Sequence, residues 1–308
     1  MRTKIVTILF LLLVGLLGLA YTFPGPPRSF DQLYAHVDPQ TARSLQNFRI
    51  NNPPAQIDVG GVRWEYLLLG QGEQTILFLH GMSGAYDIWW QQMEALKDRY
   101  RLLTVTYPAV DSLDELAQGI TAILDREGID SVNLVGSSLG GYLAQYLIAT
   151  HPDRVDKAVF ANTFPPNELI AHRYRLVTPP LPYLPVGLIM TVVRININTD
   201  LYPASGYSEL VKAYLLEQSY GRMTKNQFVS RYRCVVEDFP PPDIDAISVP
   251  VMIIESDNDP LLDETLRSML KQTYPSAKII TLSSAGHFPY LNMAEEYTRL
   301  LHEFFEDV

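Results

Sequence analysis

The stretch Gly136-Ser137-Ser138-Leu139-Gly140 follows an apolar run at 132–135 and precedes a helix-forming run at 142–150. A G-x-S-x-G pattern between a strand and a helix places its serine on a sharp, strained turn, and the glycines let neighbouring backbone pass close by. The five residues alone are a weak signal. Their place between a buried strand and a helix makes Ser138 a candidate nucleophile.

The composition indicates one catalytic domain with an insertion. The chain has 308 residues, of which 47% are hydrophobic, enough to bury one large core. Its formal net charge of −10 and the absence of a Lys/Arg cluster argue against a nucleic-acid partner. Cys234 is the single cysteine, so we expect no internal disulfide and no multi-cysteine metal site, and we expect Cys234 to be buried. We expect no metal and no organic cofactor.

An apolar segment opens the chain. Arg2 and Lys4 lead into an almost unbroken apolar run from Ile5 to Phe23, which is at the lower limit of length for a membrane span. We expect residues 1–23 to form a retained transmembrane anchor, and the alternative is a signal segment cleaved near Gly18-Leu19-Ala20. The leading basic residues predict that the folded domain lies on the extracytoplasmic side, or is periplasmic or secreted after cleavage.

The rest of the chain predicts a mostly parallel sheet flanked by helices. Residues 24–54 form a proline-containing linker with short helices, and a β-hairpin with strands at 57–59 and 62–69 follows. Strands then alternate with helices, which is typical of a parallel sheet covered on both faces. The expected strands lie at 75–79, 102–106, 132–135, 155–160, 249–254 and 278–282, and the expected helices at 88–96, 113–126, 142–150, 265–272 and 295–305.

This alternation stops between residues 163 and 247. The segment is rich in proline at 178–185 and has helical stretches at 210–217 and 225–236. We expect it to be a helical cap inserted between the core segments 55–162 and 248–308, over the carboxyl ends of the strands. Its Tyr, Leu and Met content predicts a covered apolar pocket.

A serine nucleophile needs a base, and that base needs an acid to orient it. With this motif the acid and then the histidine follow the serine along the chain. His287, in the loop after the last predicted strand, is the candidate base, because the other five histidines lie in the leading segment, at strand or helix ends, in the cap or in the final helix. Asp259 is the candidate acid, Asp257 is the alternative, and Asp263 has the position of a helix N-cap.

Two backbone amides are expected to bind the oxyanion of an acyl-transfer reaction. One belongs to Leu139, directly after the nucleophile, and the other to Met82. Met82 lies in His80-Gly81-Met82-Ser83-Gly84, which we call the oxyanion loop. We expect His80 to support this loop and Ser83 to serve its turn.

These motifs, taken in order with Asp259-Pro260 and Gly286-His287, resemble the α/β-hydrolase superfamily over residues 57–305. Within it the chain looks like the maspardin branch. The resemblance implies an α/β-hydrolase fold with an inserted helical cap. Maspardin-type proteins are thought to act partly as noncatalytic binding partners without the triad histidine, whereas this sequence has His287. The superfamily's common Gly-x-x-Asp pattern before proline is changed, since Ser256 replaces the glycine. The likeness to maspardin rests on Tyr107-Pro108, the run 136–145, Ala161-Asn162-Thr163-Phe164, Tyr274-Pro275 and Phe288-Pro289-Tyr290-Leu291.

Together these features predict a serine hydrolase that cleaves a carboxylic ester with an apolar, lipid-like acyl group. Serine at the elbow excludes the related epoxide and haloalkane hydrolases, which resemble the fold but carry aspartate there. Amide, thioester and C–C cleavage use the same triad and stay open. A membrane-anchored noncatalytic scaffold is the alternative from another class. The expected partners are a small apolar ester and, through the N-terminal segment, a membrane.

Overall fold

The computed structural model describes residues 2–22, 26–241 and 249–306. Within them an eight-stranded sheet has the order β1-β2-β4-β3-β5-β6-β7-β8. The β1–β2 and β2–β4 pairs are antiparallel and all other neighbours are parallel, which confirms the predicted mostly parallel sheet. The strands are β1 (Ala55–Val59), β2 (Val62–Leu69), β3 (Thr75–Leu79), β4 (Arg101–Thr106), β5 (Val132–Ser137), β6 (Val155–Ala161), β7 (Val251–Ser256) and β8 (Lys278–Leu282).

The central strands are buried on both faces, as their continuous apolar sequence predicts. In β3, Ile76 and Phe78 join one hydrophobic cluster while Leu77 and Leu79 join another, because successive side chains of a strand point to opposite faces. Helices α4 (Trp90–Leu96) and α14 (Ala294–Glu306) contribute to the first cluster. Helices α5 (Leu113–Arg126), α6 (Leu139–Thr150) and α12 (Glu264–Thr273) contribute to the second.

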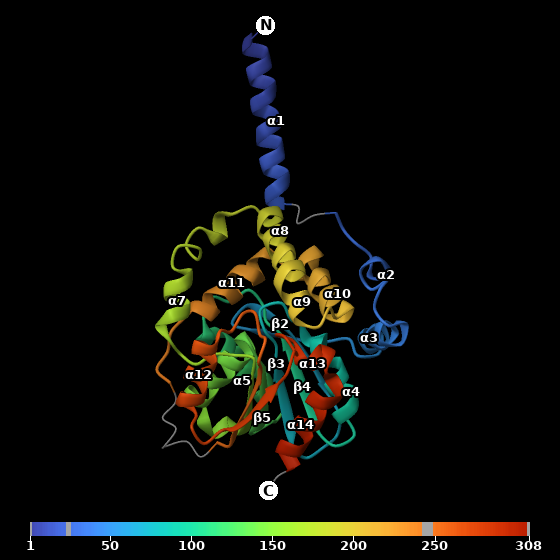
Figure 1. Cartoon of the computed structure of the whole chain (residues 1–308), viewed down its shortest axis with the longest axis vertical. Helices are drawn as coiled ribbons and strands as arrows, with labels where there is room; N and C mark the ends of the chain where they lie inside the picture. The colour runs from blue at the N-terminus through green and yellow to red at the C-terminus, as the bar shows by residue number, and fades with distance from the viewer. Residues whose placement is uncertain (1, 23–25, 242–248, 307–308) are drawn as a thin grey trace.

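Three helices precede the sheet. They are α1 (Arg2–Thr22), α2 (Phe30–Leu33) and α3 (Pro39–Asn51). The first projects from the body beside the cap helix α8 (Val186–Asn196), with exposed apolar side chains (Figure 1). Helix α3 instead packs Leu45 and Phe48 into the core. In the described part of the chain, no helix has the length and apolar character needed to cross a membrane. Phe23, the last residue of the predicted span, lies outside the described residues.

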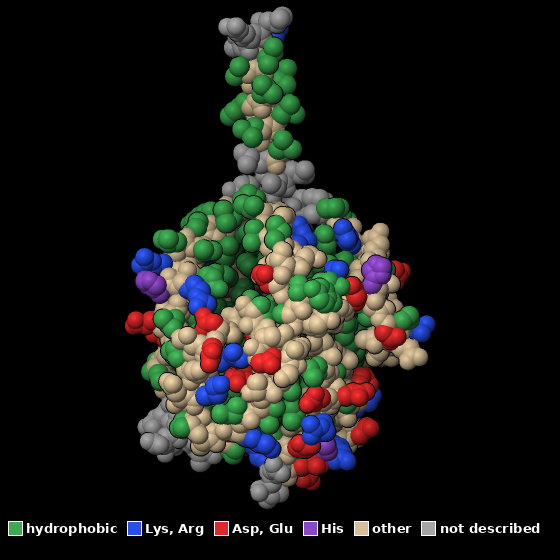
Figure 2. Space-filling model, viewed as in Figure 1, with side chains coloured by type: hydrophobic (Ala, Val, Ile, Leu, Met, Phe, Trp, Pro, Cys, Tyr) green, Lys and Arg blue, Asp and Glu red, His purple; other side chains and the backbone are tan. Residues whose placement is uncertain are grey.

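Between β6 and β7 the chain forms helices that lie beyond the carboxyl ends of the parallel strands (Figure 1). The helices expected at 210–217 and 225–236 are present as α10 and α11. Hydrophobic side chains gather on this upper part of the molecule (Figure 2). The expected end of the cap, at residue 247, lies outside the described residues. The segment contains α7 (Glu168–Tyr174), η3 (Leu181–Tyr183), α8 (Val186–Asn196), η4 (Ile197–Leu201), α9 (Tyr202–Ala204), α10 (Glu209–Glu217), η5 (Gln218–Arg222) and α11 (Lys225–Val236).

Several element ends differ from the sequence prediction. The helix after the serine begins at Leu139 rather than at residue 142. Gly140 and Gly141 belong to its first turn, where the absence of a side chain allows close packing against neighbouring segments. β7 continues past residue 254, since Glu255 is buried there and accepts hydrogen bonds from Lys271 and Thr281. The expected helix at 88–96 starts as the 3₁₀ turn η1 (Tyr86–Trp89). The short helix α13 (Pro289–Asn292) was not predicted.

Candidate active site

Ser138 lies at the junction of β5 and α6, in a backbone conformation that is rare for a residue with a side chain. Its φ is 55° and its ψ is −121°. The Ser138 amide donates a 3.0 Å hydrogen bond to the Ala161 carbonyl, and the Ser138 carbonyl accepts a 2.7 Å bond from Thr163 Oγ1. These contacts with the end of β6 hold the strained turn. The Ser138 side chain is partly exposed, so a substrate can reach it.

The glycines around Ser138 are required by packing. A Cβ on Gly140 would lie 2.0 Å from the Leu79 carbonyl oxygen, and one on Gly136 would lie 2.3 Å from the Gly140 carbonyl oxygen. A Cβ on Gly81 would lie 3.6 Å from Ser138 Oγ. The oxyanion loop therefore lies directly against the serine.

Asp259 and His287 form a buried pair. His287 Nδ1 donates a 2.7 Å hydrogen bond to Asp259 Oδ2, and the Leu261 amide donates one of 2.9 Å to Asp259 Oδ1. Burial by itself raises the pKa of Asp259, but the His287 ring and the donors Asn162 and Leu261 outweigh it and hold the pKa below its ordinary value of 3.8. The carboxylate is thus ionised at neutral pH and can orient the imidazole.

The two other candidate acids have different roles. Asp257 is exposed, and its Oδ1 accepts a 2.8 Å hydrogen bond from the Ser284 amide. Its neighbour Asn258 accepts one of 2.9 Å from the Gly286 amide, so the acid loop is joined to the histidine loop by two backbone contacts. Asp263 caps α12, as the sequence predicts, by accepting from the Leu266 amide. Of the three, Asp259 contacts the His287 ring.

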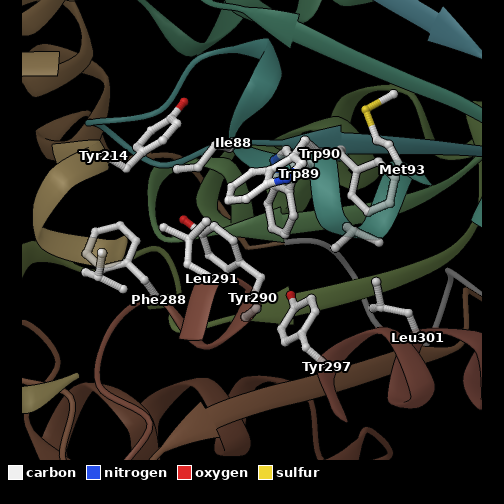
Figure 3. Close-up of a cluster of buried hydrophobic side chains, with 14 of the residues drawn as sticks. Ile88, Trp89, Trp90, Met93, Tyr214, Phe288, Tyr290, Leu291, Tyr297 and Leu301 are labelled. Carbon is white, nitrogen blue, oxygen red and sulfur yellow. The ribbon is translucent and has the colours of Figure 1, made fainter. Parts of the chain in front are cut away.

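The histidine loop is anchored by the residues that follow it. Phe288 and Tyr290 enter the hydrophobic cluster shown in Figure 3, where the Tyr290 and Trp89 rings lie with centroids 4.1 Å apart and planes tilted by 30°. Gly286 has a φ of 64°, and a Cβ there would lie 2.9 Å from the Ala204 carbonyl of the cap. The hydrophobic cluster around Tyr290 and the cap backbone at Ala204 therefore hold the loop that carries His287.

Asn162, at the end of β6, links the serine turn to the acid. This role was not predicted from the sequence. Its Nδ2 donates to Asp259 Oδ2 at 2.8 Å, to Ser256 Oγ at 3.1 Å and to the Gly286 carbonyl at 3.2 Å. Its φ is 43°, an uncommon value that asparagine tolerates better than most residues. The signal available in the sequence was an asparagine directly after a buried strand.

The three candidate triad residues follow the carboxyl ends of β5, β7 and β8, which are joined through Asn162 and Thr163 at the end of β6. No hydrogen bond links Ser138 Oγ to His287 among those of the described residues. Catalytic hydrogen bonds often tighten only in the substrate complex. The strand order brings the predicted triad to one edge of the sheet.

Leu139 and Met82 are the candidate oxyanion donors. Leu139 is the first residue of α6, where backbone amides lack partners within the helix. The Gly81 carbonyl accepts a 2.7 Å hydrogen bond from His80 Nδ1 and a 3.1 Å bond from the Gly84 amide. Because the C=O and N–H of a trans peptide point in opposite directions, this turns the Met82 N–H away from His80.

His80 supports this loop as an uncharged ring. It is fully buried, its Nε2 accepts from the Tyr107 amide at 3.3 Å, and burial, with the nearby charge of Arg231, holds its pKa well below the ordinary value of 6.5. Cys234 is buried, as expected, and burial raises the pKa of its thiol to about 12. Within the described residues, no group of three or more His, Cys, Asp or Glu side chains could hold a metal ion.

Comparison with known proteins identifies the family of the chain. A family model described as "Alpha/beta hydrolase family" matches residues 76–300. The chain is 26% identical to maspardin of Mus musculus over 239 residues, 72% of this chain and 71% of that protein. It is 24% identical to a 2-hydroxy-6-oxononadienedioate/2-hydroxy-6-oxononatrienedioate hydrolase of Burkholderia vietnamiensis, over 79% of this chain and 91% of that protein.

Two further likenesses are more limited. The chain is 33% identical to the dihydrolipoyllysine-residue acetyltransferase component of an acetoin cleaving system of Cupriavidus necator, but over only 32% of this chain and 29% of that protein. It superposes on the enol-lactonase of Burkholderia xenovorans with a TM-score of 0.68 and 19% identity, over 82% of this chain and 100% of that one. This last likeness shows the fold alone.

Proposed function

The chain belongs to the α/β hydrolase family, and from this premise we propose that it is a serine hydrolase that cleaves carboxylic esters. The observation that carries the proposal is the buried 2.7 Å hydrogen bond from His287 to Asp259, at the same edge of the sheet as the strained Ser138. A histidine oriented by a buried carboxylate can activate a serine.

In this proposal His287 Nε2 accepts the proton of Ser138 Oγ as the oxygen attacks the ester carbonyl carbon. The amides of Leu139 and Met82 donate to the oxyanion that forms, and Asp259 stabilises the imidazolium. His287 then returns the proton to the departing alcohol, which leaves an acyl group on Ser138. His287 then removes a proton from a water molecule as the water oxygen attacks the acyl carbon, and it returns this proton to Ser138 Oγ as the acyl–Oγ bond breaks and the acid leaves.

We propose that the acyl group is apolar. The cap lies beyond the strand ends that carry the candidate triad, and it buries hydrophobic side chains in two small clusters, among them Ile189, Met190 and Met223. We expect an octanoyl ester to be hydrolysed with a higher kcat/KM than the matching acetyl ester, and the reverse order would exclude an apolar acyl pocket.

The proposal is tested by hydrolysis of p-nitrophenyl octanoate. The purified full chain in detergent is compared with Ser138→Ala, whose rate should fall by on the order of 10³-fold or more, as for other triad serines. A folded Ser138→Ala protein that hydrolyses the ester as fast as the native chain would overturn the proposal.

The maspardin relatives support a second candidate, a noncatalytic binding protein. The two functions make opposite predictions for Ser138→Ala in cells. If the chain is a scaffold, the variant restores all cellular function of a deletion strain. If it is an enzyme, the variant restores none that depends on turnover.

From the sequence we also propose a location. Arg2, Lys4 and the apolar run from Ile5 support attachment to a membrane, with the hydrolase domain on the extracytoplasmic side, or export after cleavage of the segment. The test is fractionation of cells with mass spectrometry of the N-terminus. Full-length chain in the cytosolic fraction would overturn both forms of the proposal.

A further inference from the structure

Arg231 is a buried cation on the cap helix α11. Its side chain is among the largest fully buried ones of the described residues, at 2% exposure. Among these residues it forms no ion pair with a carboxylate, and burial lowers its pKa to about 10. Removing a charge from water costs several kcal/mol unless hydrogen bonds offset the loss. The hydrogen-bond partners of Arg231 therefore indicate the role of its buried guanidinium group.

Those partners are three backbone carbonyls of two loops beside the serine and, at 3.6 Å from Nη1, the sulfur of Met223. Arg231 Nη1 donates to the Met82 carbonyl at 2.7 Å and to the Gly84 carbonyl at 2.9 Å, both in the oxyanion loop. Its Nη2 donates to the Tyr107 carbonyl at 3.0 Å, directly after β4. The guanidinium also lies 5.7 Å from the centre of the Tyr107 ring. One cap side chain thus joins the ends of two core strands.

These contacts fix the direction of the loop amides. His80 holds the Gly81 carbonyl, and Arg231 holds the next carbonyl, that of Met82. In trans peptides the Met82 N–H then points away from His80, and the Ser83 N–H points away from Arg231. The loop backbone at Gly81 lies against Ser138, so preorganised amides here can serve the oxyanion.

We infer that Arg231 is a positioning residue for the oxyanion loop: by holding the Met82 and Gly84 carbonyls, this cap residue fixes the loop whose Met82 amide is the candidate oxyanion donor. The inference rests on the proposed function. Arg231 contacts backbone rather than substrate, so its loss should lower the rate of acylation and leave substrate binding nearly unchanged. Its buried positive charge also favours the negative charge that develops nearby.

The test measures kcat and KM for p-nitrophenyl octanoate in the full chain, with Arg231→Met and Arg231→Lys. Lysine keeps the charge but cannot span carbonyls on two loops with a planar fork. We expect both variants to lose about 10²-fold in kcat, the size of one lost oxyanion donor, with KM within about threefold. Circular dichroism confirms that each variant is folded.

Arg233→Met and Arg233→Lys are the matched controls. Arg233 lies on the same helix with its side chain 40% exposed and pairs with Asp111 at the surface, so these variants should keep native kcat and KM. The inference is overturned if a folded Arg231 variant keeps native kcat, if only KM changes, or if neither variant folds, because Arg231 would then be a folding residue. A native chain without Ser138-dependent activity would instead overturn the proposed function.

Discussion

The side-chain amide of Asn162 donates a 2.8 Å hydrogen bond to Oδ2 of Asp259. The same oxygen accepts a bond from the His287 ring, so the end of β6 takes part in fixing the acid between its two partners. Asn162 is 97 residues from Asp259 in the sequence. The central strand β6 therefore aligns the serine turn with the acid and histidine loops.

Replacing Asn162 by alanine should lower kcat by roughly tenfold or more. A hydrogen bond to a charged group is worth about 1.5–3 kcal/mol, and its loss lets the Asp259 carboxylate move. The rate of ester hydrolysis measures the effect. Asn226→Ala, at an exposed position of the cap, is the control and should keep the native rate. Native kcat in folded Asn162→Ala would show that the acid is aligned without this amide.

Asp257 and Asp259 should differ sharply in their contribution to catalysis. Asp259→Asn should reduce kcat by on the order of 10⁴-fold, since a neutral amide no longer holds the catalytic tautomer of His287. Asp257→Asn keeps a side-chain oxygen that can accept from the Ser284 amide and should change kcat by less than about threefold. Parallel ester assays decide the matter, and a larger loss in Asp257→Asn would reverse the assignment.

Asp87 should make stability sensitive to acid. Its carboxylate is fully buried and pairs with Arg49 at 2.5 Å and with Arg222 at 2.7 Å, which joins α3 and the cap to the core. Burial raises the pKa of Asp87, but Arg222 and Arg49 outweigh it and leave the pKa below 3.8. This stabilisation is therefore complete above that ordinary value and is lost as the pH falls through the lower folded value.

Urea unfolding at pH 7 and at pH 3 tests this expectation with Asp87→Asn. At pH 7 the variant should be less stable by about 3 kcal/mol, because Arg49 and Arg222 lose the buried carboxylate that they share and are left with Glu217. At pH 3 the difference from the native chain should shrink. A difference that is the same at both pH values would mean that Asp87 does not titrate with folding.

Gly140→Ala should prevent normal packing of the serine turn. The new Cβ would lie 2.0 Å from the Leu79 carbonyl oxygen and 2.9 Å from that of His80, and these backbone atoms have little room to move. We expect a loss of about 3 kcal/mol or more in the free energy of unfolding. Gly128→Ala, at a φ of 62° with no atom within 4 Å, should cost only about 1 kcal/mol. Equal losses would show that packing at Gly140 is not limiting.

The fold and the identities of the candidate triad residues could be predicted because their signals are local. Apolar strand runs, the glycines around Ser138 and the loops that follow strands each occupy a few consecutive residues. Cap helices α7 and α8 were missed because prolines surround them, although a proline such as Pro185 is compatible with the residue before a helix. These prolines interrupt the sequence pattern from which a helix in the cap would be predicted.

The supporting residues could not be predicted, because their partners are distant in sequence. Arg231 is 149 residues from Met82, and Arg222 is 135 residues from Asp87. A buried arginine and a surface arginine have the same appearance in a sequence. Tertiary packing alone decides that Arg231 is buried against carbonyls while Arg233, on the same helix, pairs at the surface.

Covalent labelling with a fluorophosphonate probe tests the central claim most directly, because the probe reacts with activated serines. The full chain in detergent is labelled and digested, and the modified peptide is identified by mass spectrometry. We expect the phosphonyl group on Ser138, no labelling of Ser138→Ala, and labelling of His287→Ala slowed by at least about 10³-fold. A folded native chain that stays unlabelled, or a Ser138→Ala protein that labels like the native chain, would contradict a serine hydrolase built on Ser138.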